Sequence, residues 1–221
     1  MKILSFDKLV NEILMPQKNN LIVIFPGRFQ PFHTGHKKFY ELAKKQFPAA
    51  DFFIATSDIP EKDAAKDPER YPFNFNEKRE IMMSAGIPEN EIVQVKQPYK
   101  PTEILKNYDP NVAKVIYIVG EKDMKDDPRF AFGMTKKGKP TYFQPFKNLN
   151  ELQPFKEDGG HGYIFSPGTI QFSVNGKNIT SASKLRNLYK SSDENTRKEI
   201  IKQILGKFDP NIYSLFNSKL S

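Results

Sequence analysis

The feature that most constrains the fold is a run of five apolar residues, Leu21–Phe25, followed directly by Pro26 and Gly27. A continuous apolar run of this length is typical of a strand that is buried on both faces. Residues 35–47 then repeat apolar side chains at helical spacing, and Pro48 ends that helix. A doubly buried strand that leads into a helix is the building unit of a parallel sheet with helices on its faces.

The same alternation continues along the chain. Further strands are predicted at 51–57, 92–95 and 114–120. Further helices are predicted to begin at Asn74 or Asn76, at Ser181, and at Ser192 or Asp193. The dipeptide Asn175-Gly176 predicts a hairpin turn. We therefore predict an α/β fold, a Rossmann-like parallel sheet flanked by helices.

One segment breaks this pattern. Residues 124–168 are rich in Pro, Gly, Phe and Lys, show no periodicity, and are too many for a plain loop. We interpret them as an inserted segment, with a lid as one form it could take, within a main domain of residues 20–206. Residues 1–19 are predicted to form an amphipathic helical extension, and residues 207–221 a C-terminal tail.

Composition restricts the possible chemistry and partners. The chain has no cysteine, which excludes disulfides, thiol catalysis and thiolate metal sites. No apolar stretch approaches the roughly 20 residues that span a membrane, and no signal peptide is recognised, so a cytoplasmic protein is expected. The net charge of +8 favours anionic partners such as nucleotides, nucleic acid or acidic membranes.

Two of the three histidines lie in the stretch GRFQPFHTGH, residues 27–36, where the first strand meets its helix. Ligands of open α/β sheets bind at the carboxyl ends of strands, and helix N-termini attract phosphate. The i,i+3 spacing of His33 and His36 would place both on one face, with Cβ atoms about 5–6 Å apart. Gly35 would let an anion approach the backbone, and Arg28 adds a forked donor suited to phosphate oxygens.

Three roles are open to the histidine pair. The pair could hold a nucleoside triphosphate, hold a metal ion, or serve the structure alone. Zinc needs three or four ligands, and only His161 remains as a further histidine, so no metal site is expected. The residue types leave the triphosphate and structural roles open.

GRFQPFHTGH closely resembles the H-x-G-H motif of the nucleotidylyltransferase superfamily, and its longer form resembles that of nicotinamide mononucleotide adenylyltransferases. Three later segments also resemble family motifs, in the same order: Tyr71–Met82, Val119–Met124 and Ser181–Arg186. Two positions depart from the pattern. Lys78 stands where the family usually has Arg, and Ser183 stands where it usually has Thr. The likeness covers about residues 20–125 and 178–206.

The resemblance implies attack by a mononucleotide phosphate on the α-phosphorus of ATP, with Mg²⁺ carried by the nucleotide. For nicotinamide mononucleotide as acceptor, the products are NAD and pyrophosphate. The implied catalytic residues are His33, His36 and Arg186. The implied ATP-binding residues are Gly27, Arg28, Phe29, Gly35, Ser181, Ser183 and Arg186. The implied acceptor-binding residues are Gly120, Lys122 and Asp123.

Several alternatives remain beside this prediction. The acceptor could be phosphopantetheine or flavin mononucleotide, or CTP could be the donor for a phosphorylated alcohol. The R-T-x-G-I-S run of cytidylyltransferases is absent, so CTP is less favoured than ATP as the donor. From another class, the chain could be a basic nucleic-acid-binding or structural protein on the same fold. Family members of this kind are often homo-oligomers, although no residue here indicates one.

Overall fold

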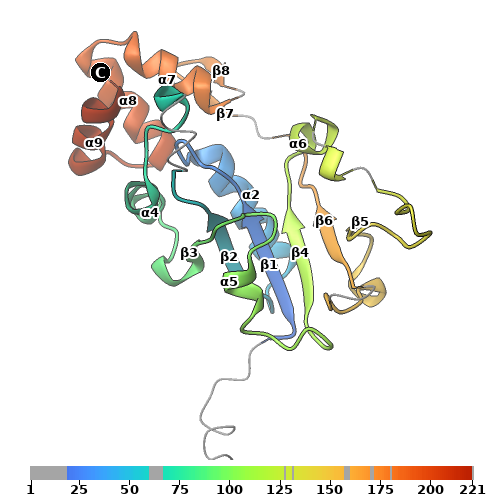
Figure 1. The fold of residues 1–221 in the computed structure, drawn as a ribbon. Coiled ribbons are helices and arrows are strands. Elements are labelled where there is room, and N and C mark those ends of the chain that lie inside the picture. Colours follow the sequence, from blue (N-terminus) through green and yellow to red (C-terminus); the bar gives the residue numbers. More distant parts are fainter. Residues whose placement is uncertain are drawn as a thin grey trace, which may run out of the picture.

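A computed structural model describes residues 19–59, 67–126, 128–130, 132–156, 160–169, 172–179 and 181–220. Its centre is a six-stranded sheet in the order β3-β2-β1-β4-β6-β5, in which every neighbouring pair is parallel (Figure 1). The strands are β1 (Leu21–Pro26), β2 (Asp51–Thr56), β3 (Ile92–Gln94), β4 (Lys114–Ile118), β5 (Phe143–Pro145) and β6 (Gly162–Phe165). The predicted α/β fold with a Rossmann-like parallel sheet is confirmed.

Helices connect these strands and extend beyond the last one. The described helices are α2 (Thr34–Gln46), α4 (Phe75–Ser84), α5 (Thr102–Leu105), α6 (Glu121–Asp126), α7 (Ala182–Lys190), α8 (Glu194–Leu205) and α9 (Pro210–Leu220). Single 3₁₀ turns lie at η1 (Pro68–Arg70), η2 (Glu89–Glu91), η3 (Pro128–Phe130) and η4 (Leu149–Glu151). The predicted helix starts are explained by capping: Asn74 and Glu77 form a reciprocal capping box at α4, and Asp193 accepts from the Thr196 N–H at α8.

The first strand is buried on both faces, as its apolar run predicts. Ile22 and Ile24 belong to the apolar cluster on one side of the sheet, whereas Val23 and Phe25 belong to the cluster on the other. The predicted hairpin also forms: β7 (Phe172–Val174) pairs antiparallel with β8 (Lys177–Ile179). Asn175 and Gly176 adopt φ of 49° and 72° in its turn, the left-handed conformation that Asn and Gly tolerate best.

The segment predicted as an insertion contributes two strands to the main sheet. Within residues 124–168, β6 pairs with β4 and β5 forms the edge. The β6 run is only four residues long and begins at Gly162, so its strand pattern is weak in the sequence. A side chain at Gly162 would collide there, because a Cβ atom would lie 2.7 Å from the rings of both Tyr117 and Tyr142.

The segment predicted as a C-terminal tail contains α9, which packs against the body of the domain (Figure 1). Ile212, Phe216 and Leu220 recur at i,i+4,i+8 and are buried, and the Phe216 ring contacts Phe73 and Tyr189. The predicted N-terminal extension lies almost wholly outside the described residues. Among the described residues, no helix is long and apolar enough to cross a membrane.

Candidate functional site

The GRFQPFHTGH loop lies where the strand order reverses. From β1 the chain proceeds to β2 and β3 on one side of the sheet and later to β4 on the other, so β1 and β4 are neighbours. Ligands of open α/β sheets bind in the crevice at the carboxyl ends of two such strands. His33 is the N-cap residue of α2, and Gly120 stands between β4 and α6. The first and third resembling segments therefore meet at one end of the sheet.

The first glycine of the loop is required by close packing. The Gly27 N–H donates to the Ala55 carbonyl at 3.0 Å, which ties the loop to β2. Phe29 has a φ of +46°, and its ring lies over Gly27, so that a Cβ atom there would be 2.7 Å from the ring. Phe29 is only 4% exposed and packs edge-on against Phe25 and His36. Its side chain therefore shapes the loop from inside.

The two histidines lie on one face, as their spacing predicts. Their rings stack with centroids 3.7 Å apart and planes at 26°. The other partner of His33 is Phe172 of β7, stacked at 4.0 Å. His36 also contacts the rings of Phe29 and Phe32. Neither Nδ1 atom finds a hydrogen-bond partner in another described residue, although both are buried.

Burial among aromatic rings keeps both histidines neutral. It lowers the pKa of His33 well below its usual value, helped by repulsion from His36. Burial alone lowers the pKa of His36 to about 3. A neutral imidazole still offers one N–H donor and one acceptor nitrogen. A bound anion would favour the charged form, so anion binding and protonation are coupled at this pair.

Arg186, which was predicted from the closing motif, reaches back to the first loop. Its Nη1 donates to the Gln30 carbonyl at 2.6 Å, and its Nη2 donates to the Ser183 hydroxyl at 3.2 Å. Arg186 is 8% exposed, and burial lowers the pKa of its guanidinium. Asp67 and Glu69 attract the charge of Arg186, whereas Arg28 and Arg70 repel it more weakly. Guanidinium groups and carboxylates therefore both lie within electrostatic range of Arg186.

Ser181 and Ser183 have defined structural partners. Ser181 is the N-cap residue of α7, and its hydroxyl accepts from the Lys184 N–H at 3.3 Å. Ser183, in the first turn of α7, is exposed apart from its contact with Arg186. Both hydroxyls thus lie at the N-terminus of a helix, where backbone N–H groups favour an anion.

The side chain of Gln30 joins the first and second resembling segments, a role that sequence reasoning missed. Its Nε2 donates to the Phe73 carbonyl at 2.7 Å, and its Oε1 accepts from the Phe73 N–H at 2.9 Å. Because its own carbonyl accepts from Arg186, one buried residue connects three of the four segments. No periodicity or spacing indicated this contact, which spans 43 residues.

Lys78, which replaces the family's usual Arg, is 1% exposed and points at the end of β2. Its ammonium donates to the Thr56 hydroxyl at 3.0 Å and to the Ser57 carbonyl. Burial lowers the pKa of Lys78 to about 8. In this structure the side chain ties α4 to β2.

The residues predicted to bind the acceptor follow β4 and lead into α6. Gly120 is buried, and Asp123 lies exposed in α6. The side chain of Lys122 falls outside the described part of the chain. Thr169 donates from its hydroxyl to Glu121 at 2.9 Å, which joins the start of α6 to the segment after β6. No group of three or more metal-ligating side chains occurs among the residues described.

The parallel sheet and the H-x-G-H loop at its switch point are those of a nucleotidylyltransferase. A sequence model of the family described as "Cytidylyltransferase-like" matches residues 24–193, more than three quarters of the chain. The chain therefore belongs to the cytidylyltransferase-like family, and this membership supports nucleotidyltransferase activity in general. No curated protein matches the sequence.

Proposed function

We propose that the protein transfers an adenylyl group from ATP to nicotinamide mononucleotide, giving NAD and pyrophosphate. The observation that carries a phosphoryl-type transfer is the stacked pair His33 and His36 at the switch point of the sheet, whose Nδ1 atoms have no hydrogen-bond partner among the described residues. The choice of acceptor rests on the likeness of GRFQPFH to the nicotinamide mononucleotide adenylyltransferases.

The proposed reaction asks little acid–base chemistry of the protein. The attacking phosphate is already an anion, so no general base is needed. The protein must hold two anions together and stabilise the charge that develops on the transferring group. Imidazoles, guanidiniums and helix N-termini serve that task, whereas a catalytic carboxylate would repel both substrates. Mg²⁺ would travel with the triphosphate, since it prefers oxygen ligands and keeps its waters.

Each residue has a proposed place in this scheme. His36 contacts the α-phosphate in the transition state, and His33 and Arg28 contact the triphosphate. Ser181, Ser183 and Arg186 bind the β- and γ-phosphates from the N-terminus of α7. The backbone at Gly27, Phe29 and Gly35 lets the nucleotide approach closely, and Gly120, Lys122 and Asp123 contact the acceptor.

The pair His33 and His36 gains protons as the anion binds, because the ligand's charge offsets the cost of burying imidazolium.

The test is an activity assay with a panel of substrates. The pure protein is incubated with Mg²⁺ and either ATP or CTP, against acceptors led by nicotinamide mononucleotide. Pyrophosphate release and the product mass are measured. The expected product has the mass of NAD. Turnover with another acceptor or with CTP would keep the transferase class and refute the specificity proposed.

A pair of variants tests the assignment of the site. His36→Ala should lower turnover roughly 10²–10³-fold, the usual effect of losing one preorganised donor. His161→Ala is the matched control, because His161 precedes β6, outside the H-x-G-H loop, and should keep wild-type turnover. Near-normal turnover by His36→Ala would show that the assignment is wrong.

A further inference from the structure

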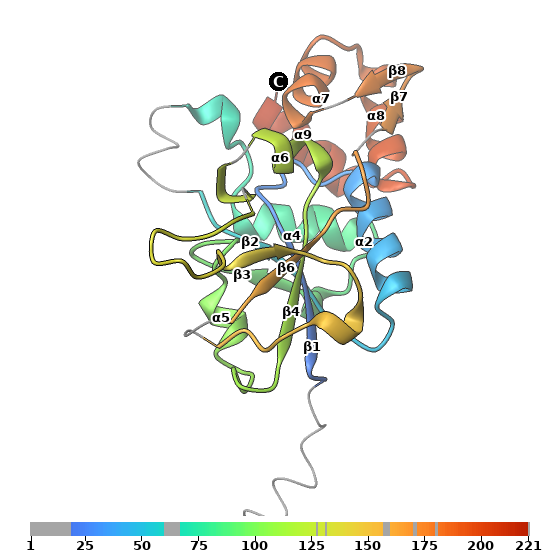
Figure 2. The same cartoon turned by 90° about the vertical axis from the view of Figure 1, so that its right-hand side faces the viewer.

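An exposed basic loop lies at the opposite edge of the sheet from β3, in the segment first interpreted as an insertion. Residues 132–142, which we call the basic hairpin, run out from η3 and return into the edge strand β5. Figures 1 and 2 show this yellow segment projecting away from the sheet. The hairpin is ordered by its own backbone: Thr135 donates to Lys139 at 2.7 Å, and Thr141 donates to Gly133 at 2.8 Å.

The surface of the basic hairpin combines positive charge with exposed apolar side chains. Lys136, Lys137 and Lys139 are exposed at its tip, and residues 132–142 contain no Asp or Glu. Phe132 is 37% exposed and Met134 is 66% exposed. Tyr142, at the end of the hairpin, is 38% exposed. This combination suits a polyanion that also presents flat apolar faces.

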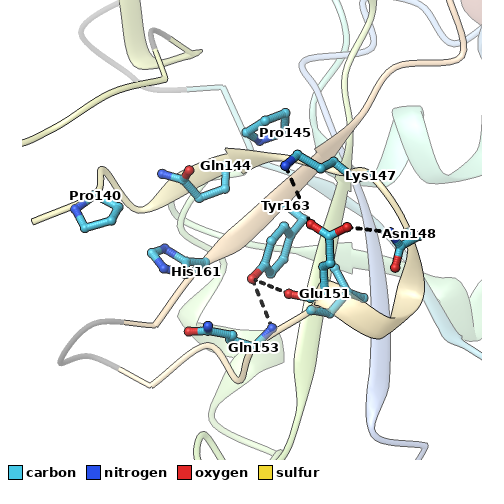
Figure 3. Close-up of a pocket in the computed structure, with 10 residues that line it drawn as sticks. Pro140, Gln144, Pro145, Lys147, Asn148, Glu151, Gln153, His161 and Tyr163 are labelled. Atoms are coloured by element: carbon cyan, nitrogen blue, oxygen red, sulfur yellow. Dashed lines mark hydrogen bonds and ion pairs between the residues drawn. The ribbon is translucent and has the colours of Figure 1, made fainter.

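A cavity of about 260 Å³ adjoins the base of the hairpin and is shown in Figure 3. It is lined by residues of β5, η4 and β6 and by Pro140 of the hairpin. The Gln144 amide donates to the Thr141 carbonyl at 2.6 Å, which fixes the cavity to the hairpin. The volume is slightly below the range of about 300–1,000 Å³ typical of small-molecule sites, and so suits one planar ring.

The cavity offers hydrogen-bonding groups, and the negative charge of its Glu151 side chain is balanced by Lys147. His161 lines it beside Tyr163, and the His161 Nδ1 has no hydrogen-bond partner in the described part of the chain. The Glu151 carboxylate accepts from the Asn148 amide at 2.6 Å and pairs with Lys147 at 3.6 Å (Figure 3). Among the described residues that line the cavity, Glu151 is the only acidic one, and its pairing leaves little net negative charge there to repel an anion.

We propose that the basic hairpin and this cavity bind single-stranded nucleic acid. The three lysines contact the phosphate backbone, Phe132 stacks on a base, and the cavity receives a neighbouring base beside His161. Stacking of this kind requires unpaired bases, because the faces of bases in a duplex are already covered. The surface lies beside the edge strand β5, whereas the histidine pair lies at the end of β1. The proposal does not depend on the reaction at the histidine pair.

The experiment measures binding of fluorescent 12-nucleotide probes, oligo-dT and oligo-U, by anisotropy across salt concentrations. For three phosphate contacts on a single strand, log K should fall with log [salt] with a slope of about −2, so raising salt from 50 to 200 mM should weaken binding about 20-fold. The preferred probe shows whether DNA or RNA is bound. A duplex probe should bind more weakly than the single strand. Saturating ATP should not displace the probe.

Matched variants locate the contact. Lys136→Gln/Lys137→Gln/Lys139→Gln should reduce the salt slope by about 2. Its control removes three exposed lysines elsewhere, Lys45→Gln/Lys106→Gln/Lys177→Gln, and should keep the wild-type slope. The two variants carry the same net charge, so a general loss of positive charge would affect them equally. Phe132→Ala should weaken binding about tenfold with an unchanged salt slope, since only stacking is lost.

Three outcomes would overturn the proposal. The first is no binding by the wild type at 50 mM salt. The second is an equal salt slope for the two triple-lysine variants. The third is binding of the protein to vesicles of anionic phospholipid without binding to any of the oligonucleotides. That result would show that the hairpin contacts a lipid surface. Circular dichroism of each variant ensures that lost binding reflects the side chains removed.

Discussion

The neutral state of the buried histidines should make the free protein less stable in mild acid. Burial lowers the pKa of His36 from 6.5 to about 3 in the folded chain. Below pH 6.5 the unfolded chain therefore binds a proton that the folded chain does not, and the stability present above that pH is lost as pH falls. His33, whose pKa burial also lowers, adds a loss of the same sign.

The magnitude for His36 follows from its unfolded pKa alone, once the folded value lies well below the pH used. Proton binding by His36 in the unfolded chain enters the free energy through the factor 1 + 10^(pKa − pH), with an unfolded pKa of about 6.5. This factor rises about tenfold between pH 7.5 and pH 5.5. The free energy of unfolding therefore falls by RT times the natural logarithm of ten, or about 1.4 kcal/mol. This loss is larger than the stability that most single surface interactions contribute. It is a sizeable part of a typical free energy of unfolding of about 5–15 kcal/mol.

The assay is urea unfolding at both pH values for the wild type and His36→Gln. The chain has no tryptophan, so circular dichroism or tyrosine fluorescence reports the transition. The variant cannot titrate at this position, so its loss on acidification should be smaller than that of the wild type by about 1.4 kcal/mol. Inorganic triphosphate should reduce the wild-type loss, because a bound anion favours the protonated pair. Equal losses for the two proteins without ligand would refute the reasoning.

Two further predictions concern long-range contacts. Gln30→Ala removes both hydrogen bonds to the buried backbone of Phe73, and should lower the free energy of unfolding by about 2–4 kcal/mol in chemical denaturation; a loss below about 1 kcal/mol would show that water or a local shift replaces them. Phe216→Ala removes a fully buried ring from α9, and should cost about 3–5 kcal/mol. A negligible cost, measured in the same way, would mean that residues 207–221 behave as the tail first predicted.

Periodicity recovered the elements whose signals are long and local. The apolar run at β1, the capping residues of α4 and α8, and the Asn175-Gly176 turn each appear in the structure where the sequence predicts them. Each depends on the preferences of neighbouring residues, which do not require the rest of the fold. The spacing of α9 is equally regular, with apolar residues at i,i+4,i+8, so the prediction of a tail for residues 207–221 overlooks a local signal.

Elements that are short or stabilised by distant partners could not be predicted. Strand β6 has four residues, and its place beside β4 depends on pairing between Val115 and Gly162. At the candidate site, Phe172 stacks on His33 from a hairpin far along the chain, and Gln30 binds Phe73. Neither contact leaves a periodic trace, because each partner is chosen by its position in space.

The sequence by itself determined the class of fold, the position of the histidine pair at a strand end, and the common face that the i,i+3 spacing imposes. These follow from local backbone geometry and from the alternation of buried strands and helices. Only the tertiary structure decided that the pair is neutral in the free protein. The charged form of an imidazole is stabilised by surrounding water, and burial removes that water. Here the histidines are buried by aromatic rings that come from separate parts of the chain.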